Sequence, residues 1–445
     1  MRSVYWRFSI CALLALGSPG LWALDLVQAY RIAQEQDASI RASRATLAAG
    51  RERVDQARAV LLPNVSANVG RNYNDLKTTA TNILGLESTT RDDYFSHNKS
   101  ITLRQPVFHL QRLQQYRQSL TLADEALATH EQDIQDLVVR VGSVYMEALL
   151  SQEQLTLVQV QKRQYETLVE AARRAFQNGS GTRTDIDEAQ ARLDMSVAQE
   201  LEALQNQKYT RRQLELTLNQ EVTDMAPLSV TGFERIRAHE KTLQEWTQEA
   251  LAANPQARAL SARLQAAELE IAKAKANYSP TLEAVVQWSD SGNDNVSRLN
   301  ARYENRIVGL QLNIPIYQGG YVSSVVRQSV AERERIAETL EALRRDLELK
   351  VYKEYRSITE GRLKIQALEQ AVRSALMALD STTKSMAAGV RSQLDVLNAD
   401  QQLAATRRDL AQARFMYLIA RLRLHALVGM EPIDNVEDVN RAFGS

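Results

Sequence analysis

Apolar and polar residues alternate along four short stretches of the chain. A period of two residues predicts β-strands that have one apolar and one polar face. The segments between the strands of each pair, 74–97 and 290–304, are rich in polar residues and predict loops. The predicted strands cover residues 64–73, 99–107, 281–289 and 306–314.

Each pair of predicted strands is followed by a long stretch that lacks helix-breaking residues. Residues 111–177 contain no proline and only one glycine, Gly142, which predicts a continuous helix of roughly 100 Å. An apolar heptad seam of the coiled-coil type runs along the second half of this helix and is interrupted only by Lys162. The seam consists of Leu155, Val158, Lys162, Tyr165, Val169, Ala172 and Phe176.

A glycine ends each long predicted helix, and a second helix returns from the turn. At the first tip, residues 178–185, Thr182 or Thr184 is the expected N-cap of the return helix. At the second tip, residues 388–395, Gly389 makes the turn. The pattern therefore predicts two long αα-hairpins, each with a tight turn at its tip.

The same landmarks recur in the two halves of the chain at nearly constant offsets. The Pro-Val-Phe run at residues 106–108 is echoed by Pro-Ile-Tyr at residues 315–317, 209 positions later. The tip glycine Gly179 is echoed by Gly389, 210 positions later. Such spacing predicts two tandem copies of one structural unit.

The repeats divide the chain into five predicted parts. Each repeat begins with one predicted helix, over residues 25–60 in the first and 243–277 in the second. The parts are a signal peptide (1–23), the first repeat (24–220), a connecting segment (221–240), the second repeat (241–429) and a loose C-terminal tail (430–445).

The first 23 residues have the pattern of a secretory signal peptide. Arg2 and Arg7 give a positively charged segment that precedes an apolar run at residues 8–16. This run is too short to span a bilayer. Removing this segment also removes Cys11, the only cysteine, as expected for an exported protein without disulfides. Without Arg2 and Arg7, the 54 basic residues become 52 against 54 acidic ones, and this balance argues against nucleic acid as a partner.

Strands of about ten residues are long enough to cross a membrane when they are tilted. Their apolar faces would meet lipid, and their polar faces would meet a watery lumen. Four strands cannot close a barrel, since small barrels need about eight, and open edges are not tolerated in lipid. Membrane-spanning strands would therefore require a dimer or a trimer. A soluble sheet packed on helices is the alternative, but it gives the polar faces no role.

Several motifs of the chain carry a resemblance to a known family. They are the two tip turns, Leu-Pro-x-Val at 62–65, Gln-Pro-Val-Phe at 105–108, Pro-Ile-Tyr-Gln-Gly-Gly at 315–320 and the Ala-Arg-Phe segment at 411–419. These motifs resemble those of the TolC family of outer-membrane channels, and the resemblance covers essentially the whole chain after the signal peptide, in order and in both repeats. It implies a mainly α protein that forms a homotrimer in the outer membrane of a Gram-negative cell. It further implies one twelve-stranded β-barrel, with four strands from each chain, and a long α-helical coiled-coil tunnel that crosses the periplasm.

The resemblance places the periplasmic entrance of the tunnel at the two helical tips. Arg391 stands at the position of an arginine that latches the closed entrance, and its expected partners are Thr184 and Asp185 of the other hairpin. A guanidinium offers a fork of donors that suits a carboxylate and a hydroxyl. Such a partly wet pair is worth about 1 kcal/mol or less, so a partner protein can undo it. Spacing alone favours an ordinary solvated turn residue at Arg391, and the latch follows only from the resemblance.

The resemblance also implies a ring of acidic residues at the entrance. Asp395 matches one of the two aspartates of that ring, and threefold symmetry would give three carboxylates that attract cations. The second ring position holds Asn398, which weakens the expected cation selectivity. Glu188 occupies the equivalent position in the first repeat, where it either compensates for the missing acid or belongs to an ordinary solvated helix face.

No pattern in the sequence indicates catalysis, a metal site or a cofactor, since the five histidines lack metal-ligand spacing and no nucleophile–base arrangement is present. The resemblance implies an outer-membrane exit duct that works with a periplasmic adaptor (a membrane fusion protein) and an inner-membrane ABC or proton-driven transporter. Its cargo would be proteins, by type I secretion, or small toxic compounds. The alternatives are a multidrug efflux factor only, or a periplasmic coiled-coil spacer without a pore.

Overall fold

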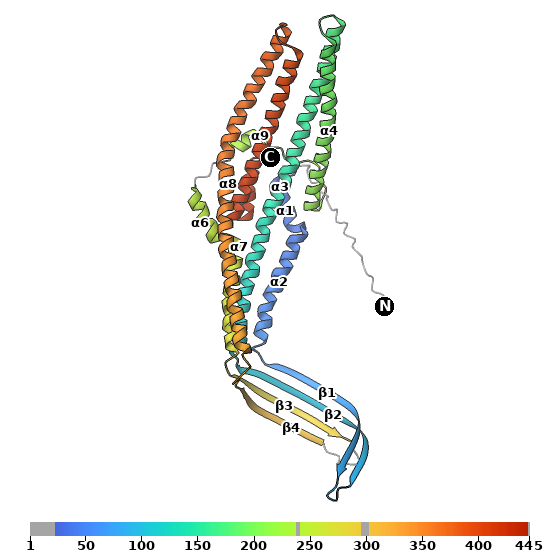
Figure 1. Ribbon diagram of the computed structural model, residues 1–445, viewed down its shortest axis with the longest axis vertical. Coiled ribbons are helices and arrows are strands. Elements are labelled where there is room, and N and C mark those ends of the chain that lie inside the picture. Colours follow the sequence, from blue (N-terminus) through green and yellow to red (C-terminus); the bar gives the residue numbers. More distant parts are fainter. Residues whose placement is uncertain (1–22, 237–240, 295–301, 444–445) are drawn as a thin grey trace, which may run out of the picture.

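The computed structural model describes residues 23–236, 241–294 and 302–443. The molecule is elongated, with a β-sheet at one end and the tips of two helical hairpins at the other (Figure 1). The predicted signal peptide, residues 1–23, lies outside the described residues except for Ala23.

The strands form one sheet in the order β1-β2-β3-β4, and every neighbouring pair is antiparallel. Each repeat contributes one hairpin, and the two hairpins join where β2 pairs with β3. Within the described residues, β1 and β4 form the two open edges of the sheet. The strands are β1 (Asn64–Thr81), β2 (Glu87–Phe108), β3 (Thr281–Asn293) and β4 (Arg302–Asn313).

The loop predicted at residues 74–97 is wrong, because β1 and β2 continue into this segment. The loop predicted at residues 290–304 is wrong at 290–293 and 302–304, which belong to β3 and β4, and residues 295–301 lie outside the described residues. β1 pairs with β2 along its full length, and the turn between them is confined to residues 82–86. The hydroxyls of Thr79 and Thr89 lie 3.1 Å apart across this hairpin. Threonine favours an extended backbone because it is branched at Cβ. Polar composition alone therefore did not separate a solvated strand from a loop.

The structure contains both predicted αα-hairpins, with 68 residues in the first long helix and 67 in the second. Gly179 and Gly389 follow these helices with φ of 73° and 77°, a conformation that side chains with a Cβ rarely adopt. None of the helices in the described ranges is both long and apolar enough to cross a lipid bilayer. The helices are α3 (Leu110–Gln177), α4 (Arg183–Leu218), α8 (Tyr321–Ala387) and α9 (Gln393–Leu427).

The heptad seam of α3 faces the return helix, and its apolar residues Val158, Tyr165 and Val169 are buried. Lys162, which interrupts this seam, forms an ion pair with the return helix: its Nζ lies 2.8 Å from Oε2 of Glu200 on α4. A single paired cation therefore fixes the register of an otherwise apolar contact.

The single helices predicted at residues 25–60 and 243–277 are wrong, since each is broken once. Asp37 caps the second helix of the first pair, and its carboxylate accepts hydrogen bonds from two backbone N–H groups. Asn254 caps the equivalent helix of the second repeat, which begins at Pro255. Short acceptor side chains and an initial proline both favour a new helix start. The helices are α1 (Leu26–Gln36), α2 (Ala38–Ala59), α6 (Leu243–Ala253) and α7 (Pro255–Ala276).

The tail that the sequence predicts to be loose is ordered and packed over its described part, residues 430–443. It forms α10 (Pro432–Asn440), in which Asn435 is completely buried. Arg421 of α9 donates two hydrogen bonds to the carboxylate of Asp438, one of them 3.1 Å long. The tail therefore packs against the core, because its charged and polar side chains form hydrogen bonds with α9. A further short helix, α5 (Val230–Arg235), lies in the connecting segment.

The main core lies midway along the molecule, where α1, α6 and α10 pack against the long helices (Figure 1). Tyr145 is fully buried there, and its hydroxyl donates to the carbonyl of Leu24 at 2.8 Å. Gly142 of α3 faces α9 so closely that an added Cβ would lie 2.4 Å from Cδ1 of Leu422. The one glycine of α3 therefore allows the two hairpins to approach each other.

Candidate channel and its entrance

The sheet leaves apolar side chains exposed in the alternating pattern of its strands. Along β4, Val308, Leu310 and Leu312 are 80%, 71% and 59% exposed, and along β1, Val65 and Val69 are 64% and 76% exposed. The outer edges of β1 and β4 are also unpaired within the described part of the chain. An exposed apolar face is costly in water, and open sheet edges are not tolerated in lipid, so this sheet is complete only within a larger assembly.

The two helical tips lie at the end of the molecule farthest from the sheet (Figure 1). Each return helix begins with the same capping box, formed by Thr182 with Asp185 and by Ser392 with Asp395. In both boxes the carboxylate accepts hydrogen bonds of 2.7 to 3.0 Å from the backbone N–H and the hydroxyl of the cap residue. The bonds from Ser392 lower the pKa of Asp395, which keeps this carboxylate charged at the helical tip.

The predicted latch is not formed within a single chain. Nη1 of Arg391 lies 3.7 Å from Oδ1 of Asp395 on its own tip, and the Arg391 side chain is 60% exposed. Asp185 bonds to Thr182 of its own helix, and Thr184 is exposed. The Arg391–Asp395 contact is long and solvated, so it restrains the arginine only weakly.

The three predicted ring residues come from both hairpins. Asp395 and Asn398 lie one turn apart on the same face of α9, while Glu188 lies in the second turn of α4. Glu188 is half-buried and forms no hydrogen bond or ion pair within residues 23–236, 241–294 and 302–443. Asn398 is exposed, and its side-chain oxygen accepts a hydrogen bond from the opposite hairpin.

That bond comes from Arg192, a residue that the sequence reasoning missed. Nη1 of Arg192 donates to Oε1 of Gln401 at 2.7 Å, and Nη2 donates to Oδ1 of Asn398 at 3.4 Å. Arg192 thus links α4 to α9 just behind the tips. The sequence did contain a signal for Arg192. It follows Glu188 by one helical turn and therefore lies on the same face of the predicted helix.

A buried carboxyl lies beside this link. Asp400 of α9 is only 9% exposed, and its Oδ2 has no hydrogen-bond partner among the described residues. Burial raises the pKa of Asp400, and burial followed by the charge of Asp400 raises the pKa of Tyr165 on α3. The Tyr165 hydroxyl accepts a hydrogen bond of 2.9 Å from Gln161. The contact between the hairpins therefore contains a polar group that is costly to keep charged.

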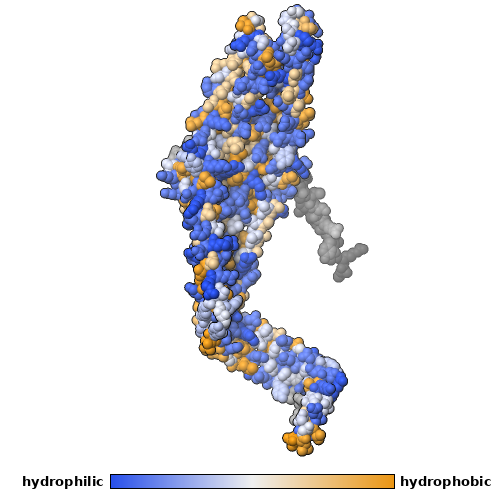
Figure 2. Space-filling model, viewed as in Figure 1, coloured by the Kyte–Doolittle hydropathy of each residue, from blue (hydrophilic) through white to orange (hydrophobic). Residues whose placement is uncertain are grey.

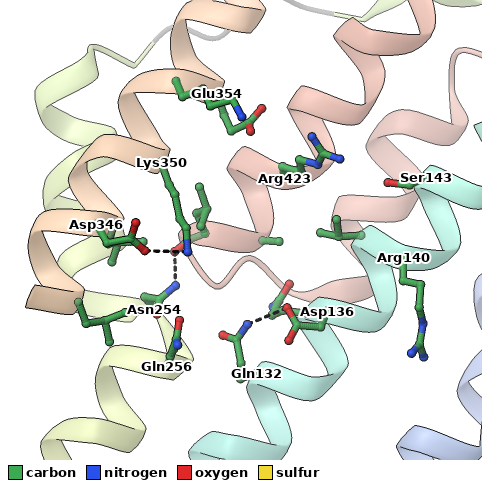
Figure 3. A pocket seen from close by; sticks show the side chains of 17 residues that line it. Gln132, Asp136, Arg140, Ser143, Asn254, Gln256, Asp346, Lys350, Glu354 and Arg423 are labelled. Carbon is green, nitrogen blue, oxygen red and sulfur yellow. Dashed lines mark hydrogen bonds and ion pairs between the residues drawn. The ribbon is translucent and has the colours of Figure 1, made fainter. Parts of the chain in front are cut away.

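A cavity of about 560 Å³ lies farther from the tips, where α9 ends and α7 begins (Figure 3). Its wall carries charges of both signs, and Nζ of Lys350 lies 2.8 Å from the carboxylate of Asp346. Burial raises the pKa of Glu354 and of Asp136 in the same wall. Within the described ranges, no group of three or more His, Cys, Asp or Glu side chains could hold a metal ion. The cavity is thus a polar gap at a helix junction.

The chain matches the sequence model of the outer membrane efflux protein family over residues 29–220 and 246–430. It is 34% identical to the alkaline protease secretion protein AprF of Pseudomonas aeruginosa, across 100% of this chain and 92% of that protein. It is 30% identical to the proteases secretion protein PrtF of Dickeya chrysanthemi, across 94% and 91%. It is 28% identical to the outer membrane protein TolC of Escherichia coli, across 92% and 82%.

Solved structures share the fold at lower sequence identity. The outer membrane channel CmeC of Campylobacter jejuni superimposes with a TM-score of 0.78 at 12% identity, covering 94% of this chain and 90% of that one. The outer membrane protein VceC of Vibrio cholerae gives a TM-score of 0.76 at 15% identity, covering 91% and 96%. At these identities the likeness concerns the fold alone.

Proposed function

The chain belongs to the outer membrane efflux protein family, and on that premise we propose that it is the exit duct of a protein secretion system. It is a channel protein of the outer membrane that extends into the periplasm. As in its relatives, the duct gives proteins or small compounds a way out of the cell.

In this fold three chains close one barrel, so four strands from each chain give twelve. The edges of β1 and β4, which are open in one chain, pair with the neighbouring chains. The exposed apolar residues of β4 then face lipid, and the polar residues between them face the lumen. Six helical hairpins continue the barrel as a tunnel toward the periplasm.

Protein cargo is favoured over small compounds by the relatives of highest identity given above. AprF and PrtF, which are similar to this chain over at least 94% of its length, are named as protease secretion proteins. Their names support type I secretion, in which an inner-membrane ABC transporter and a periplasmic adaptor would supply the energy and the link. A drug efflux channel that works with a proton-driven transporter is the second candidate, supported by the efflux protein BepC of Brucella suis at 24% identity.

A reconstitution experiment separates these two cargoes. The full chain is expressed in a Gram-negative strain that lacks its own exit duct but carries a type I ABC transporter, its adaptor and a secreted protease. We expect protease activity to appear in the medium, with unchanged growth inhibition by dyes and detergents. Restored resistance without secreted protease would instead assign the chain to drug efflux.

The entrance at the helical tips is proposed to act as the gate. In the closed trimer, Arg391 would leave its weak contact with Asp395 and latch onto Thr184 and Asp185 of the other hairpin. Asp395, Asn398 and Glu188 would form the charged ring around the opening. The exposure of the Arg391 side chain and the length of its present contact support such an exchange.

A periplasmic spacer without a pore is the remaining alternative. A spacer has no use for a sheet whose apolar residues are exposed in alternation and whose two edges are open. Fractionation with the outer membrane, together with single-channel conductance of the purified trimer in planar bilayers, tests this directly. A trimer that inserts without conducting would favour the spacer.

A further inference from the structure

The first β-hairpin extends well beyond the sheet. β2 pairs with β3 as far as Ser96↔Asn293, and the carbonyl of Phe95 still accepts a hydrogen bond of 3.0 Å from the backbone N–H of Asp294. Beyond Phe95, β1 and β2 pair only with each other among the residues that the structure describes. This arm consists of eight residue pairs, from Asn74↔Tyr94 to Thr81↔Glu87. At about 3.3 Å per residue the arm is roughly 26 Å long. Figure 1 shows the two strands bending beyond the end of β3, on the side away from the helices.

The arm is held by contacts between its own strands. Nε of Arg91 donates to Oδ1 of Asp75 at 2.9 Å, and the hydroxyls of Thr79 and Thr89 lie 3.1 Å apart. These cross-strand pairs join the two strands where no third strand of the described ranges pairs with them. The arm is therefore an ordered projection with polar flanks.

The turn at the end of the arm is also fixed by hydrogen bonds. Oδ1 of Asn82 accepts from the backbone N–H groups of Leu84 and Leu86, both at 3.0 Å. The backbone N–H of Asn82 donates to the carbonyl of Leu86 at 2.9 Å, and Gly85 has φ of 79°. An asparagine that satisfies two backbone donors holds the turn in one conformation.

This fixed turn presents its apolar side chains outward. Ile83, Leu84 and Leu86 are 105%, 80% and 64% exposed, and they form the apolar group at the lower end of Figure 2. Residues 82–86 contain no charged group. Three large apolar side chains on an ordered polar arm mark a contact surface rather than a solvated loop.

We propose that the three arms of the trimer meet over the outer mouth of the barrel and that their apolar tips, residues 83–86, pack together on its axis. The proposal rests on the proposed function, because it requires the trimeric barrel. The occupant of each tip is therefore the same tip in the two other copies.

The geometry of the barrel allows this contact. Twelve strands about 4.8 Å apart and tilted by about 40° enclose a radius of roughly 12 Å. An arm of roughly twice that length can bend across the rim and reach the axis. Threefold symmetry then brings three uncharged tips together without like-charge repulsion, while the paired charges Asp75 and Arg91 remain nearer the rim. The contact is small, so an emerging cargo chain can part the tips.

Disulfide cross-linking in the full-length trimer tests the proposal. The only native cysteine, Cys11, lies in the predicted signal peptide, so a Leu84→Cys variant has one thiol per mature chain. We expect mild oxidation to convert most of this variant to a covalent dimer on a non-reducing gel. Val69→Cys, whose residue is 76% exposed in the wild type, is the matched control and should remain a monomer. A Leu84→Cys chain that stays monomeric would overturn the closure, with Ile83→Cys as a second position.

A second measurement distinguishes contact between tips from contact with lipid. A bimane label on reduced Leu84→Cys in liposomes should be quenched by nitroxide lipids at most one-tenth as strongly as a label on Val308→Cys, which lies on the lipid-facing strand β4. Equal quenching would mean that the arms lie on the membrane, and the closure would be wrong. Failure of the wild-type chain to fractionate with the outer membrane as a trimer would count against the proposed function itself, and this result is separate from both labelling experiments.

Discussion

The guanidinium of Arg192 on α4 donates a hydrogen bond of 2.7 Å to the side-chain oxygen of Gln401 on α9, 209 positions away in the chain. This bond joins the two hairpins of one chain close to the entrance. If the proposed gate opens by separation of the hairpins, this contact opposes opening.

Replacing Arg192 with alanine should loosen the entrance. The lost hydrogen bonds are worth about 1 kcal/mol, which corresponds to a roughly fivefold larger open population. Single-channel recording in planar bilayers should show this as a higher open probability. Arg183→Ala is the matched control, since Arg183 pairs with Asp187 on its own helix and should leave gating unchanged. Equal effects of both variants would exclude a specific role for Arg192.

Reversing the charge of Arg391 tests the proposed latch. Arg391→Glu would repel Asp185 instead of binding it, so the closed entrance loses its latch and conductance should rise by several fold. Lys384→Glu provides the control, because Lys384 is 76% exposed and pairs with Asp380 on its own helix. Unchanged conductance of Arg391→Glu would leave the arginine as a solvated turn residue.

Ion selectivity tests the proposed ring. If Glu188 compensates for the missing acid at Asn398, Glu188→Gln should lower the cation preference measured by reversal potentials in a salt gradient. Asn398→Asp should raise that preference, because it restores a second ring of three carboxylates. If Asn398→Asp raises the cation preference and Glu188→Gln leaves it unchanged, Glu188 takes no part in the ring.

The buried Asp400 predicts a pH dependence of the contact between the hairpins. Burial raises the pKa of Asp400 above the ordinary aspartate value of 3.8, so the stabilising contribution of this group is present below pH 3.8 and is lost as the pH rises through the raised pKa. Tyr165 and Arg192 face this region from α3 and α4, and Arg407 lies on α9 itself. Asp400→Asn should therefore raise the thermal unfolding midpoint at pH 7 and have little effect at pH 4. Asp409→Asn, at an exposed position on α9, should change the midpoint equally at both pH values.

The packing of Gly142 predicts opposite results at two helical glycines. Gly142→Ala places a Cβ 2.4 Å from Cδ1 of Leu422, which is 1% exposed and has little space to move, so it should cost about 1–3 kcal/mol. Gly361→Ala meets its nearest atom at an ordinary 3.6 Å and should be stabilising by up to about 1 kcal/mol. Chemical unfolding of the trimer measures both. A neutral Gly142→Ala would show that α3 and α9 are loosely packed there.

Much of the architecture could be predicted from the sequence, because its signals are local. Alternation gave the positions of the four strands, and the glycines at 179 and 389 gave both tips. The wrong predictions lie where a local sequence pattern was compatible with two different structures. The threonine-rich arm between 74 and 97 resembled a loop by composition, and Asp37 was a helix cap inside a segment of good helix formers.

The sequence by itself determined the repeat, the paired strands, the long hairpins and the family that these motifs resemble, since each depends on periodicity or on residues close together in the chain. Only the tertiary structure decided which residues meet between the hairpins. Arg192 with Gln401, Gly142 with Leu422 and Asp400 beside Tyr165 each join residues more than 200 positions apart. Such pairs are set by the packing angle and register of whole helices, which no local pattern records.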